Sequence, residues 1–450
     1  MHKVIKIRKG LDIWLKGEVE LKEPRIYSPT LFAVEPTRFR MMNPRLLVQE
    51  GDTVQCGTPV VQNKFNELMF LTSPVSGIVK RVVRGDKRKL LSIEIEHDNK
   101  NNYIDFGKET PDSTSREAII DKLLRSGIWP LLRQRPYAVI ASPTDTPRDI
   151  FISAFNSAPL AANTDAFVAQ HKDVFKAGID VLKMLTTGAI HLGLHVRKND
   201  ESIYSGIGNI EIHHFDGPHP SGNIGVQIHR ISPINKGEVV WYLYPQDVVA
   251  IGQLFVAGKR EIRRLVTFAG SELKQPAMIE MLAEASVSGL LTDNLTQDNV
   301  RIISGDVLTG TSIGKDGFLG FYDQMISVIP EGDHYEFLGW ALPGFKKHSM
   351  SHAFFSWLTP KKKYRLHTNF NGGERAFVVT NQYDKVFPFD IYPVHLLKAI
   401  LVNDIDLMEK LGIYEVAEED FALCEYVCTS KIESQEIVRN GIDTMIKEMS

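Results

Sequence analysis

Residues 123–136 of the chain read Leu123-Leu124-Arg125-Ser126-Gly127-Ile128-Trp129-Pro130-Leu131-Leu132-Arg133-Gln134-Arg135-Pro136. The apolar residues of 115–127 recur at helical spacing, and the apolar run at 136–141 is typical of a buried strand. Farther on, the pattern predicts helices at 167–177 and 178–186 and strands at 189–196 and 209–213. Strands that alternate with helices over about 150 residues predict an α/β layer domain with a mostly parallel sheet.

Residues 1–104 show a different pattern, of short β-type runs separated by Gly, Pro and Asp. Two such runs flank the bend Pro74-Val75-Ser76-Gly77, and this arrangement resembles the barrel of biotinyl and lipoyl carrier domains. In those carriers the modified lysine lies eight residues before the proline. Here Asn66 occupies that position and Lys64 is two residues out of register, so we expect a structural barrel without a swinging arm.

The second half of the chain changes pattern again. Strands are expected at 262–268, around 301–303 and at 318–329, with a helix at 278–285, which suggests a β-grasp arrangement. The last 60 residues are helical and acidic, and Pro393 suits an early helix position. We therefore predict a multidomain α/β and α+β protein. Its domains are a barrel-sandwich domain (1–104), a Rossmann-like α/β domain (105–257), a β-grasp domain of the SLBB type (258–332) and a C-terminal domain (333–450).

Charge and cysteine content exclude some classes of protein. The 52 Lys and Arg against 55 Asp and Glu give a net charge of −3, which does not fit a globally basic nucleic-acid binder. Residues 1–100 are nevertheless basic, at +6, and residues 401–450 are acidic, at −8. This asymmetry suggests either docking faces of opposite sign or ordinary solvated surfaces. Three cysteines cannot build a disulfide framework, so we expect a reducing compartment.

The most membrane-like window is 239–258, but Pro245, Gln246 and Asp247 lie near its centre. An uncompensated aspartate at mid-bilayer costs about 2.5–3.5 kcal/mol. A strand at 239–244, followed by a helix from Asp247 to Gly258, accounts for these polar residues. The first ten residues alternate basic and apolar positions and lack the apolar centre of a signal peptide. We therefore expect neither a transmembrane segment nor secretion.

Four stretches carry a family resemblance. They are 123–136, Gly217-Pro218-His219-Pro220-Ser221-Gly222, the segment Arg301 to Gly310, and Ala422-Leu423-Cys424-Glu425-Tyr426-Val427-Cys428. In this order they resemble the A-subunit family (NqrA) of the Na⁺-translocating NADH:quinone oxidoreductase, which is similar in turn to RnfC and to the flavin- and NADH-binding subunit of complex I. The resemblance implies a peripheral subunit on the cytoplasmic face of the bacterial inner membrane, in a six-subunit complex that couples NADH oxidation and ubiquinone reduction to Na⁺ export.

The flavin-binding relatives have a glycine-rich loop after the pair Gly127-Ile128. Here Trp129 to Pro136 replaces that loop, with two prolines that remove N–H donors and with bulky side chains. Arg133 and Arg135 could still meet an anion. By resemblance, Gly217, His219 and Gly222 mark a degenerate nucleotide loop. We expect this chain to bind no flavin or cluster of its own, with FMN or FAD and a 2Fe–2S cluster in partner subunits.

The cysteines and histidines give weaker signals. Cys424 and Cys428 match the last two positions of a ferredoxin motif whose first two are Glu418 and Phe421. Two thiols cannot hold a cubane cluster, so we interpret the pair as a remnant, buried as small apolar side chains or completed by a partner. Cys56 has no evident histidine partner. The histidines cluster as His213, His214, His219 and His229, but the spacing is not that of a zinc site, so no metal is predicted.

Two basic-aromatic stretches are candidates for a quinone site, because polarizable side chains form an apolar slot and an arginine at its mouth can donate to a carbonyl. The candidate residues are Phe39, Arg40, Met41, Met42, Trp129, Arg133, Arg135 and Tyr137. The alternative for both stretches is packing or docking surface. Two other functions stay open: a flavin-bearing NADH dehydrogenase or RnfC-type electron-transfer subunit, and a purely structural scaffold.

Overall fold

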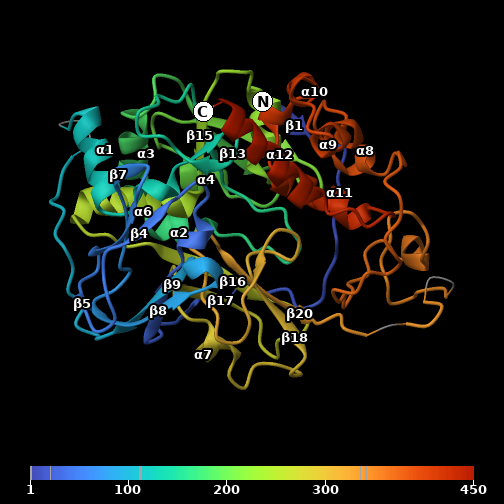
Figure 1. Cartoon of the computed structure of the whole chain (residues 1–450), viewed down its shortest axis with the longest axis horizontal. Helices are drawn as coiled ribbons and strands as arrows, with labels where there is room; N and C mark the ends of the chain where they lie inside the picture. Colours follow the sequence, from blue (N-terminus) through green and yellow to red (C-terminus); the bar gives the residue numbers. More distant parts are fainter. Residues whose placement is uncertain (1–2, 21, 111–113, 335, 340–341, 450) are drawn as a thin grey trace.

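The computed structural model describes residues 3–20, 22–110, 114–334, 336–339 and 342–449. A seven-stranded sheet occupies the centre of the molecule (Figure 1). Its first five strands are parallel, and the last two are antiparallel additions. Their spatial order is β1 (Val4–Lys6), β14 (Glu211–Asp216), β13 (Ile190–His195), β12 (Ile150–Ser153), β15 (Val240–Leu243), β10 (Arg133–Arg135) and β11 (Val139–Ile140).

Helices cover this sheet, as the alternating pattern predicted. They are α1 (Arg116–Arg125), α2 (Asp165–Gln170), α3 (Lys172–Lys183), α4 (Glu201–Tyr204), α5 (Ile224–Ile231) and α6 (Pro245–Ala257). Helix α6 ends at Gly258, which adopts φ 70° as its C-cap. Helices α3 and α6 touch through glycine, since a Cβ at Gly252 would lie 2.0 Å from the carbonyl oxygen of Val174.

The barrel-sandwich consists of two small sheets. One contains β3 (Leu31–Val34), β9 (Leu90–His97), β8 (Gly77–Arg84) and β5 (Thr53–Val54), and the other contains β4 (Pro44–Leu46), β6 (Pro59–Asn63) and β7 (Asn66–Thr72). The first strand of the chain does not join them. Because the edge of β14 offers free backbone hydrogen bonds, β1 pairs there in parallel, so the predicted domain 1–104 contributes its first strand to the α/β sheet.

The β-grasp part forms a six-stranded sheet in the order β19 (Thr311–Ser312), β18 (Val300–Ser304), β20 (Met325–Pro330), β16 (Arg263–Ala269), β17 (Ala277–Leu282) and β2 (Arg25–Ile26). The helix expected at 278–285 is wrong. Residues 277–282 pair with β16 over six consecutive positions, and this backbone pairing outweighs their helical spacing. A short helix, α7 (Ser288–Leu291), follows.

After β20, the described part of the chain contains five α-helices. These are α8 (Tyr383–Val386), α9 (Pro393–Leu401), α10 (Ile405–Lys410), α11 (Ala422–Val427) and α12 (Ser434–Met449). Pro393 is the first residue of α9, as predicted. Their apolar faces pack against Phe155 and Phe215 of the α/β part, so the C-terminal region completes one side of that domain. Among the described residues, no helix has both the length and the apolar character needed to cross a membrane.

Candidate functional site

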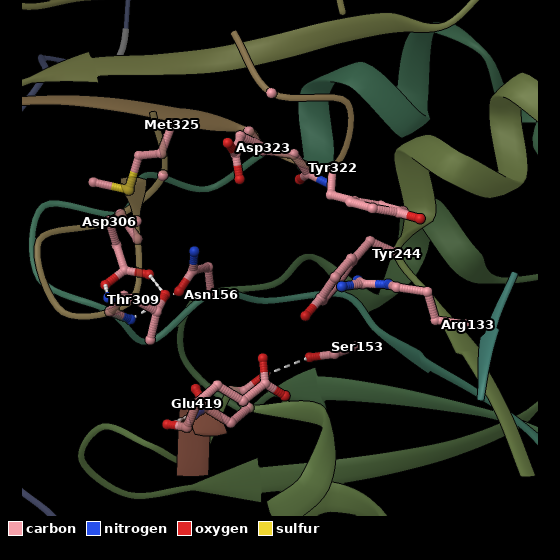
Figure 2. Close-up of a pocket in the computed structure, with 18 of the residues that line it drawn as sticks. Arg133, Ser153, Asn156, Tyr244, Asp306, Thr309, Tyr322, Asp323, Met325 and Glu419 are labelled. Carbon is pink, nitrogen blue, oxygen red and sulfur yellow. Dashed lines mark hydrogen bonds between the residues drawn. The ribbon is translucent and has the colours of Figure 1, made fainter. Parts of the chain in front are cut away.

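A cavity of about 430 Å³ lies where four parts of the chain meet (Figure 2). Ser153 ends β12, residues 154–156 follow it, and Tyr244 follows β15. From β12 the chain continues through β13 and β14 on one side and then returns to β15 on the other side, so the strand order reverses between β12 and β15. Ligands of open α/β sheets bind at such a switch point, at the carboxyl ends of the strands. Thr37, Arg38 and Arg40 form another part of the wall, together with residues of the segments 305–311, 320–325 and 417–419.

Arg133 is the arginine of the cavity that forms no ion pair within the described chain. Its guanidinium carbon lies 4.7, 5.4 and 4.6 Å from the ring centroids of Tyr242, Tyr244 and Tyr322. Figure 2 shows Arg133, Tyr244 and Tyr322 on the same side of the cavity. Nε and Nη2 are shielded from solvent and make no hydrogen bond with any described residue, and Arg133 forms no ion pair within that same part of the chain. Cation–π contacts stabilise the charge but use none of these N–H donors, so the guanidinium keeps unused hydrogen-bonding capacity.

The three tyrosines keep their protons. Burial raises the pKa of Tyr242, Tyr244 and Tyr322 above its ordinary value, although the charge of Arg133 opposes this rise. The Tyr322 hydroxyl donates to the carbonyl oxygen of Pro130 at 2.9 Å. The cage is therefore an aromatic slot with one cation and neutral hydroxyls.

Carboxylates balance the other arginines of the cavity. Arg38 lies 2.9 Å from Glu35 and 3.8 Å from Asp323, and Arg40 lies 3.6 Å from Glu418. The described lining includes three arginines and four carboxylates: Arg38, Arg40, Arg133, Asp306, Asp323, Glu418 and Glu419. A site with this balance favours a neutral ligand with acceptor oxygens over a polyanion.

The first basic-aromatic stretch contributes one of its four candidate side chains to this cavity. Arg40 lines it, whereas Phe39 packs behind the wall, with its ring centroid 4.9 Å from that of Phe321. Met41 is exposed, and Met42 packs against the barrel core. Arg40 therefore reaches the cavity because the backbone turns after the short helix at 36–38.

The second stretch also contributes one arginine. Arg133 lines the cavity, but Arg135 is fully buried beside it and pairs with Glu419 at 2.8 Å and with Asp420 at 3.1 Å. Trp129 lies in the core, where its Nε1–H donates to the carbonyl oxygen of Ala141 at 2.8 Å. Tyr137 lies outside the cavity, with its ring 6.1 Å from that of Tyr414.

The loop 217–222 reaches the same cavity through His219 and Gly222, while Gly217 packs on the backbone of Ile7. His219 is buried, with Nδ1 3.0 Å from the Ser157 hydroxyl and with Nε2 unpartnered among the described residues. Burial lowers the pKa of His219 to about 4. The imidazole is therefore neutral at physiological pH.

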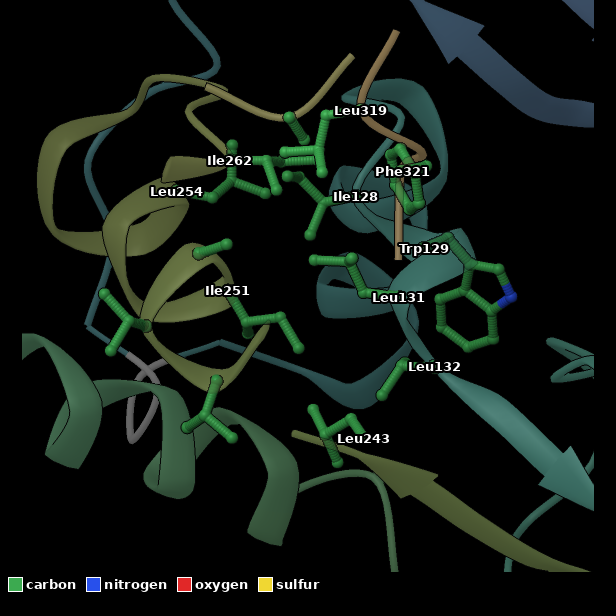
Figure 3. Packing of buried hydrophobic residues seen from close by; sticks show 14 of the residues in the cluster. Ile128, Trp129, Leu131, Leu132, Leu243, Ile251, Leu254, Ile262, Leu319 and Phe321 are labelled. Carbon is green, nitrogen blue, oxygen red and sulfur yellow. The ribbon is translucent and has the colours of Figure 1, made fainter. Parts of the chain in front are cut away.

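The residues present do not fit a flavin phosphate. After Ile128, where flavin-binding relatives need a glycine-rich loop, Trp129, Leu131 and Leu132 are fully buried. Leu131 and Leu132 lie toward Leu243 and toward Ile251 of α6, and the Trp129 ring points away from them (Figure 3). These side chains occupy the space that a phosphate cradle would need, and two prolines lack the N–H donors of such a cradle.

The cysteines do not form a site either. Cys424 and Cys428 are buried in the C-terminal helical core, and burial raises the pKa of the Cys424 thiol well above its usual range. The Cys428 sulfur accepts a hydrogen bond from the backbone N–H of Ile432 at 3.4 Å. Cys56 is buried elsewhere, and its thiol donates to the carbonyl oxygens of Pro74 and Arg260. These positions cannot supply four converging thiolates.

The sequence reasoning missed the tyrosines that enclose Arg133. Tyr242 and Tyr244 belong to the apolar run that ends at Pro245, and a parallel strand ends there. The sequence signal that could have identified them is the location of this run at the carboxyl end of a predicted strand, where ligands of α/β sheets bind. Tyr322 comes from the β-grasp part, about 80 residues away in sequence, and no local pattern connects it to the others.

Comparison with known proteins gives three matching family models in chain order. They are the NqrA N-terminal barrel-sandwich hybrid domain at 5–98, the NqrA second alpha/beta domain at 114–260 and the NQRA C-terminal domain at 265–314. The A subunit of the Na(+)-translocating NADH-quinone reductase of Rhodopirellula baltica is 38% identical over 99% of this chain and 98% of its own length. The chain belongs to this A-subunit family.

Other members of the A-subunit family match over a similar extent. The member from Yersinia pseudotuberculosis is 37% identical over 99% of this chain and all of its own length. Among solved structures, an NAD+-reducing [NiFe]-hydrogenase in the H2-reduced state is 13% identical at a TM-score of 0.38. That match covers 75% of this chain and 64% of the hydrogenase chain.

Proposed function

We propose that this chain is the peripheral A-type subunit of a Na⁺-translocating NADH:quinone reductase, which couples NADH oxidation and quinone reduction to Na⁺ export. The observation that carries this proposal is similarity along the whole chain, with 37–38% identity to relatives that bear this name. We place the chain on the cytoplasmic face of the bacterial inner membrane, in a complex of six subunits.

Purification from the native host tests this assignment. An affinity tag on the chain should bring down membrane-embedded subunits from a detergent extract, together with Na⁺-stimulated NADH:quinone reductase activity. Deletion of the chain should abolish that activity in membranes, and re-expression should restore it. A chain that purifies alone, with membrane activity intact after its deletion, would contradict the proposal.

We further propose that the cavity around Arg133 binds the quinone head group. The head group is planar and neutral, and its carbonyl oxygens accept hydrogen bonds. In this proposal the head group binds in the cavity beside the cluster of Arg133, Tyr242, Tyr244 and Tyr322, and Arg133 turns its unused N–H groups to a quinone carbonyl. The balanced charges of the lining favour this ligand over a phosphate-bearing nucleotide.

In this proposal the chain binds and orients quinone, and electrons come from cofactors in partner subunits. FMN or FAD and a 2Fe–2S cluster would supply the redox chemistry when bound there. The aromatic rings hold the plane of the head group, Arg133 sets the direction of one carbonyl, and buried walls exclude water from it. Absorbance at flavin wavelengths in the chain after its partner subunits have been removed would contradict the assignment of these cofactors to partners.

Titration with a short-tail ubiquinone tests the quinone site. A hydrogen bond from a charged donor contributes about 1.5–3 kcal/mol, so Arg133→Ala should weaken binding about tenfold to a hundredfold. Arg133→Lys should restore part of it, and Arg45→Ala, an exposed arginine of the barrel, should bind as the parent does. Absence of saturable binding, or equal binding by Arg133→Ala, would remove the site and leave a scaffold role.

An exposed aromatic and basic surface is the best candidate for docking to the membrane subunits. Phe337, Phe345 and Phe370 are 91%, 65% and 65% exposed, and Lys346 and Lys361 are exposed near them in sequence. The segment lies on the side of the molecule away from the barrel (Figure 1). Apolar rings among lysines fit an apolar partner surface with acidic residues at its edge.

A further inference from the structure

Two neighbouring strands bring together a histidine pair that the sequence pattern did not connect. The clustered histidines do not converge: His214 lies 3.0 Å from Glu201, His229 lies 2.7 Å from Glu415, and His219 faces the cavity. His213 instead meets His191 of β13, which comes 22 residues earlier. This pair lies near the amino ends of β13 and β14, whereas the cavity lies at carboxyl strand ends.

Strand register places a carboxylate beside this pair. In the parallel ladder His191 is opposite Glu211, and His213 is two residues farther along the same strand as Glu211. Because side chains alternate between faces, Glu211 and His213 share one face of β14. Nδ1 of His191 lies 3.0 Å from Nε2 of His213 and 3.5 Å from Oε2 of Glu211. Nε2 of His213 lies 4.0 Å from the same Glu211 oxygen.

These separations are those of ligands around one small cation. At metal–ligand distances of about 2.0–2.1 Å, tetrahedral ligand atoms stand about 3.3 Å apart. The three atoms form one face of such a tetrahedron, and the fourth position is open toward solvent, because the Glu211 side chain is 63% exposed. His191 and His213 are more buried, at 8% and 23%, and their positions are held by the sheet.

The surroundings also suit a divalent metal ion. Asp149 Oδ1 lies 3.9 Å from Nε2 of His191, on the ring side opposite Nδ1, where metal-binding histidines commonly have a carboxylate. The nearby charge of Arg148 is offset by Asp149 and by Glu238, at 2.9 and 2.8 Å. Burial lowers the pKa of both imidazoles, so protons compete weakly for their nitrogens.

We propose that His191, Glu211 and His213 bind one divalent transition-metal ion of the zinc class. Two imidazoles and one carboxylate select Zn²⁺, Co²⁺ or Ni²⁺ over Mg²⁺ and Ca²⁺, which prefer oxygen ligands. The ion joins β13 to β14 through side chains at an end of the sheet that the quinone cavity does not use. Without metal, the two imidazoles share one N–H···N hydrogen bond at 3.0 Å.

A second triplet, His334, Glu336 and His367, provides a matched comparison. There the carboxylate is already engaged, because Lys347 forms an ion pair with Glu336. Glu211 forms no ion pair with a lysine or arginine of the described chain, so its charge is available to a cation. We therefore expect the first triplet to bind metal more tightly than the second.

The test uses the full-length chain without a histidine tag, stripped with a chelator and titrated with Co²⁺ and then Zn²⁺. The parent should bind one equivalent, with the visible absorption of tetrahedral Co²⁺ that Zn²⁺ displaces, and Zn²⁺ should raise its melting temperature. Glu211→Gln and His213→Gln should each weaken binding at least tenfold and remove the thermal shift. The control His334→Gln/His367→Gln should behave as the parent does, and Mg²⁺ should have no effect in any form.

Three results would overturn the proposal. The first is a parent that binds no Co²⁺ or Zn²⁺ at micromolar concentration. The second is equal binding by Glu211→Gln and His213→Gln, and the third is binding lost only in the His334→Gln/His367→Gln control. Circular dichroism of each stripped variant separates loss of binding from loss of folding. Both substitutions lie at partly exposed side chains, so we expect these variants to fold.

Discussion

At the scale of the residue, Arg133 and Arg135 show how partners decide a side chain's role. Both come from β10, two positions apart, and both guanidinium groups lie over the Tyr242 ring. Arg135 is fully buried and paired with Glu419 and Asp420 of the C-terminal region. Arg133 lines the cavity, forms no ion pair with a carboxylate of the described chain and keeps unused N–H donors. One arginine therefore joins two parts of the fold, and the other is available to a ligand.

Loss of one partner from the buried pair should be costly. Arg135→Met leaves the Asp420 carboxyl buried without its cation, which costs about 3–5 kcal/mol for comparable pairs. Urea unfolding should show this loss of unfolding free energy. The matched control Arg40→Met removes a pair in which Arg40 is 54% exposed, and it should change stability by less than about 1 kcal/mol. Equal effects of the two substitutions would contradict the role assigned to Arg135.

His219 should make the chain sensitive to acid. Burial lowers its pKa from 6.5 to about 4, with Asp306 and Asp12 opposing the shift. Between these values the unfolded chain binds more protons, so the free energy of unfolding falls as pH decreases from 6.5 toward 4. His219→Gln should lose less stability between pH 7.5 and pH 4.5 than the parent does, in urea unfolding. The exposed-site control His352→Gln should follow the parent, and a variant as acid-sensitive as the parent would count against this assignment.

At the scale of the element, residues 129–136 take the place of the glycine-rich loop that flavin-binding relatives have after α1, and their first residues pack into the hydrophobic core. Trp129 to Leu131 form one turn of 3₁₀ helix whose side chains are all buried, and Trp129 meets Trp241 edge to face at 5.5 Å. The quinone interpretation of Trp129 rested on its aromatic character, but its surroundings are apolar side chains and one carbonyl. Element type was predicted well at α6, but the helices expected at 167–177 and 178–186 divide α3 at Gly178, whereas the structure has its break at His171, between α2 and α3. The prediction failed at β17, because pairing with β16 decides that segment.

Trp129 should therefore act as a structural residue. Trp129→Ala opens a large cavity and leaves the carbonyl of Ala141 without its donor, which should cost about 3–5 kcal/mol of unfolding free energy. Urea unfolding measures this, with Trp14→Ala as the control, since Trp14 is 42% exposed and should cost less than about 1 kcal/mol. A stable Trp129→Ala variant that has lost quinone binding would favour the ligand role instead.

At the scale of the whole molecule, much of the acidic C-terminal region pairs within the chain. Glu418 lies 3.6 Å from Arg40, Glu409 lies 2.7 Å from Lys236, and Glu419 lies 2.8 Å from Arg135. The charge asymmetry thus serves in part to hold the C-terminal region on the rest of the fold. The exposed aromatic and basic surface is a separate feature, and it is the part that we assign to docking.

Changes to this surface should weaken attachment to the complex. Phe337→Ser/Phe345→Ser/Phe370→Ser should lower the share of the chain that sediments with membranes, and rising salt should release it further as screening weakens the lysine contacts. The control Phe65→Ser changes a 73% exposed side chain of the barrel and should sediment as the parent does. Immunoblots of washed membranes measure both, and unchanged retention of the triple variant would place the docking surface elsewhere.

The sequence by itself determined the barrel-sandwich, the family and part of the α/β domain, namely the strands at 189–196, 209–213 and 239–244 and the helix from Asp247, because periodicity, turn residues and motifs are local in the chain. It also identified two arginines that reach the cavity. It did not predict the central strand β12 or the helix α5. Only the tertiary structure decided which residues meet: the tyrosines around Arg133, the pair of Arg135 with Asp420, and His191 beside His213. These contacts depend on the order and register of strands, and hydrogen bonds between distant segments set that order.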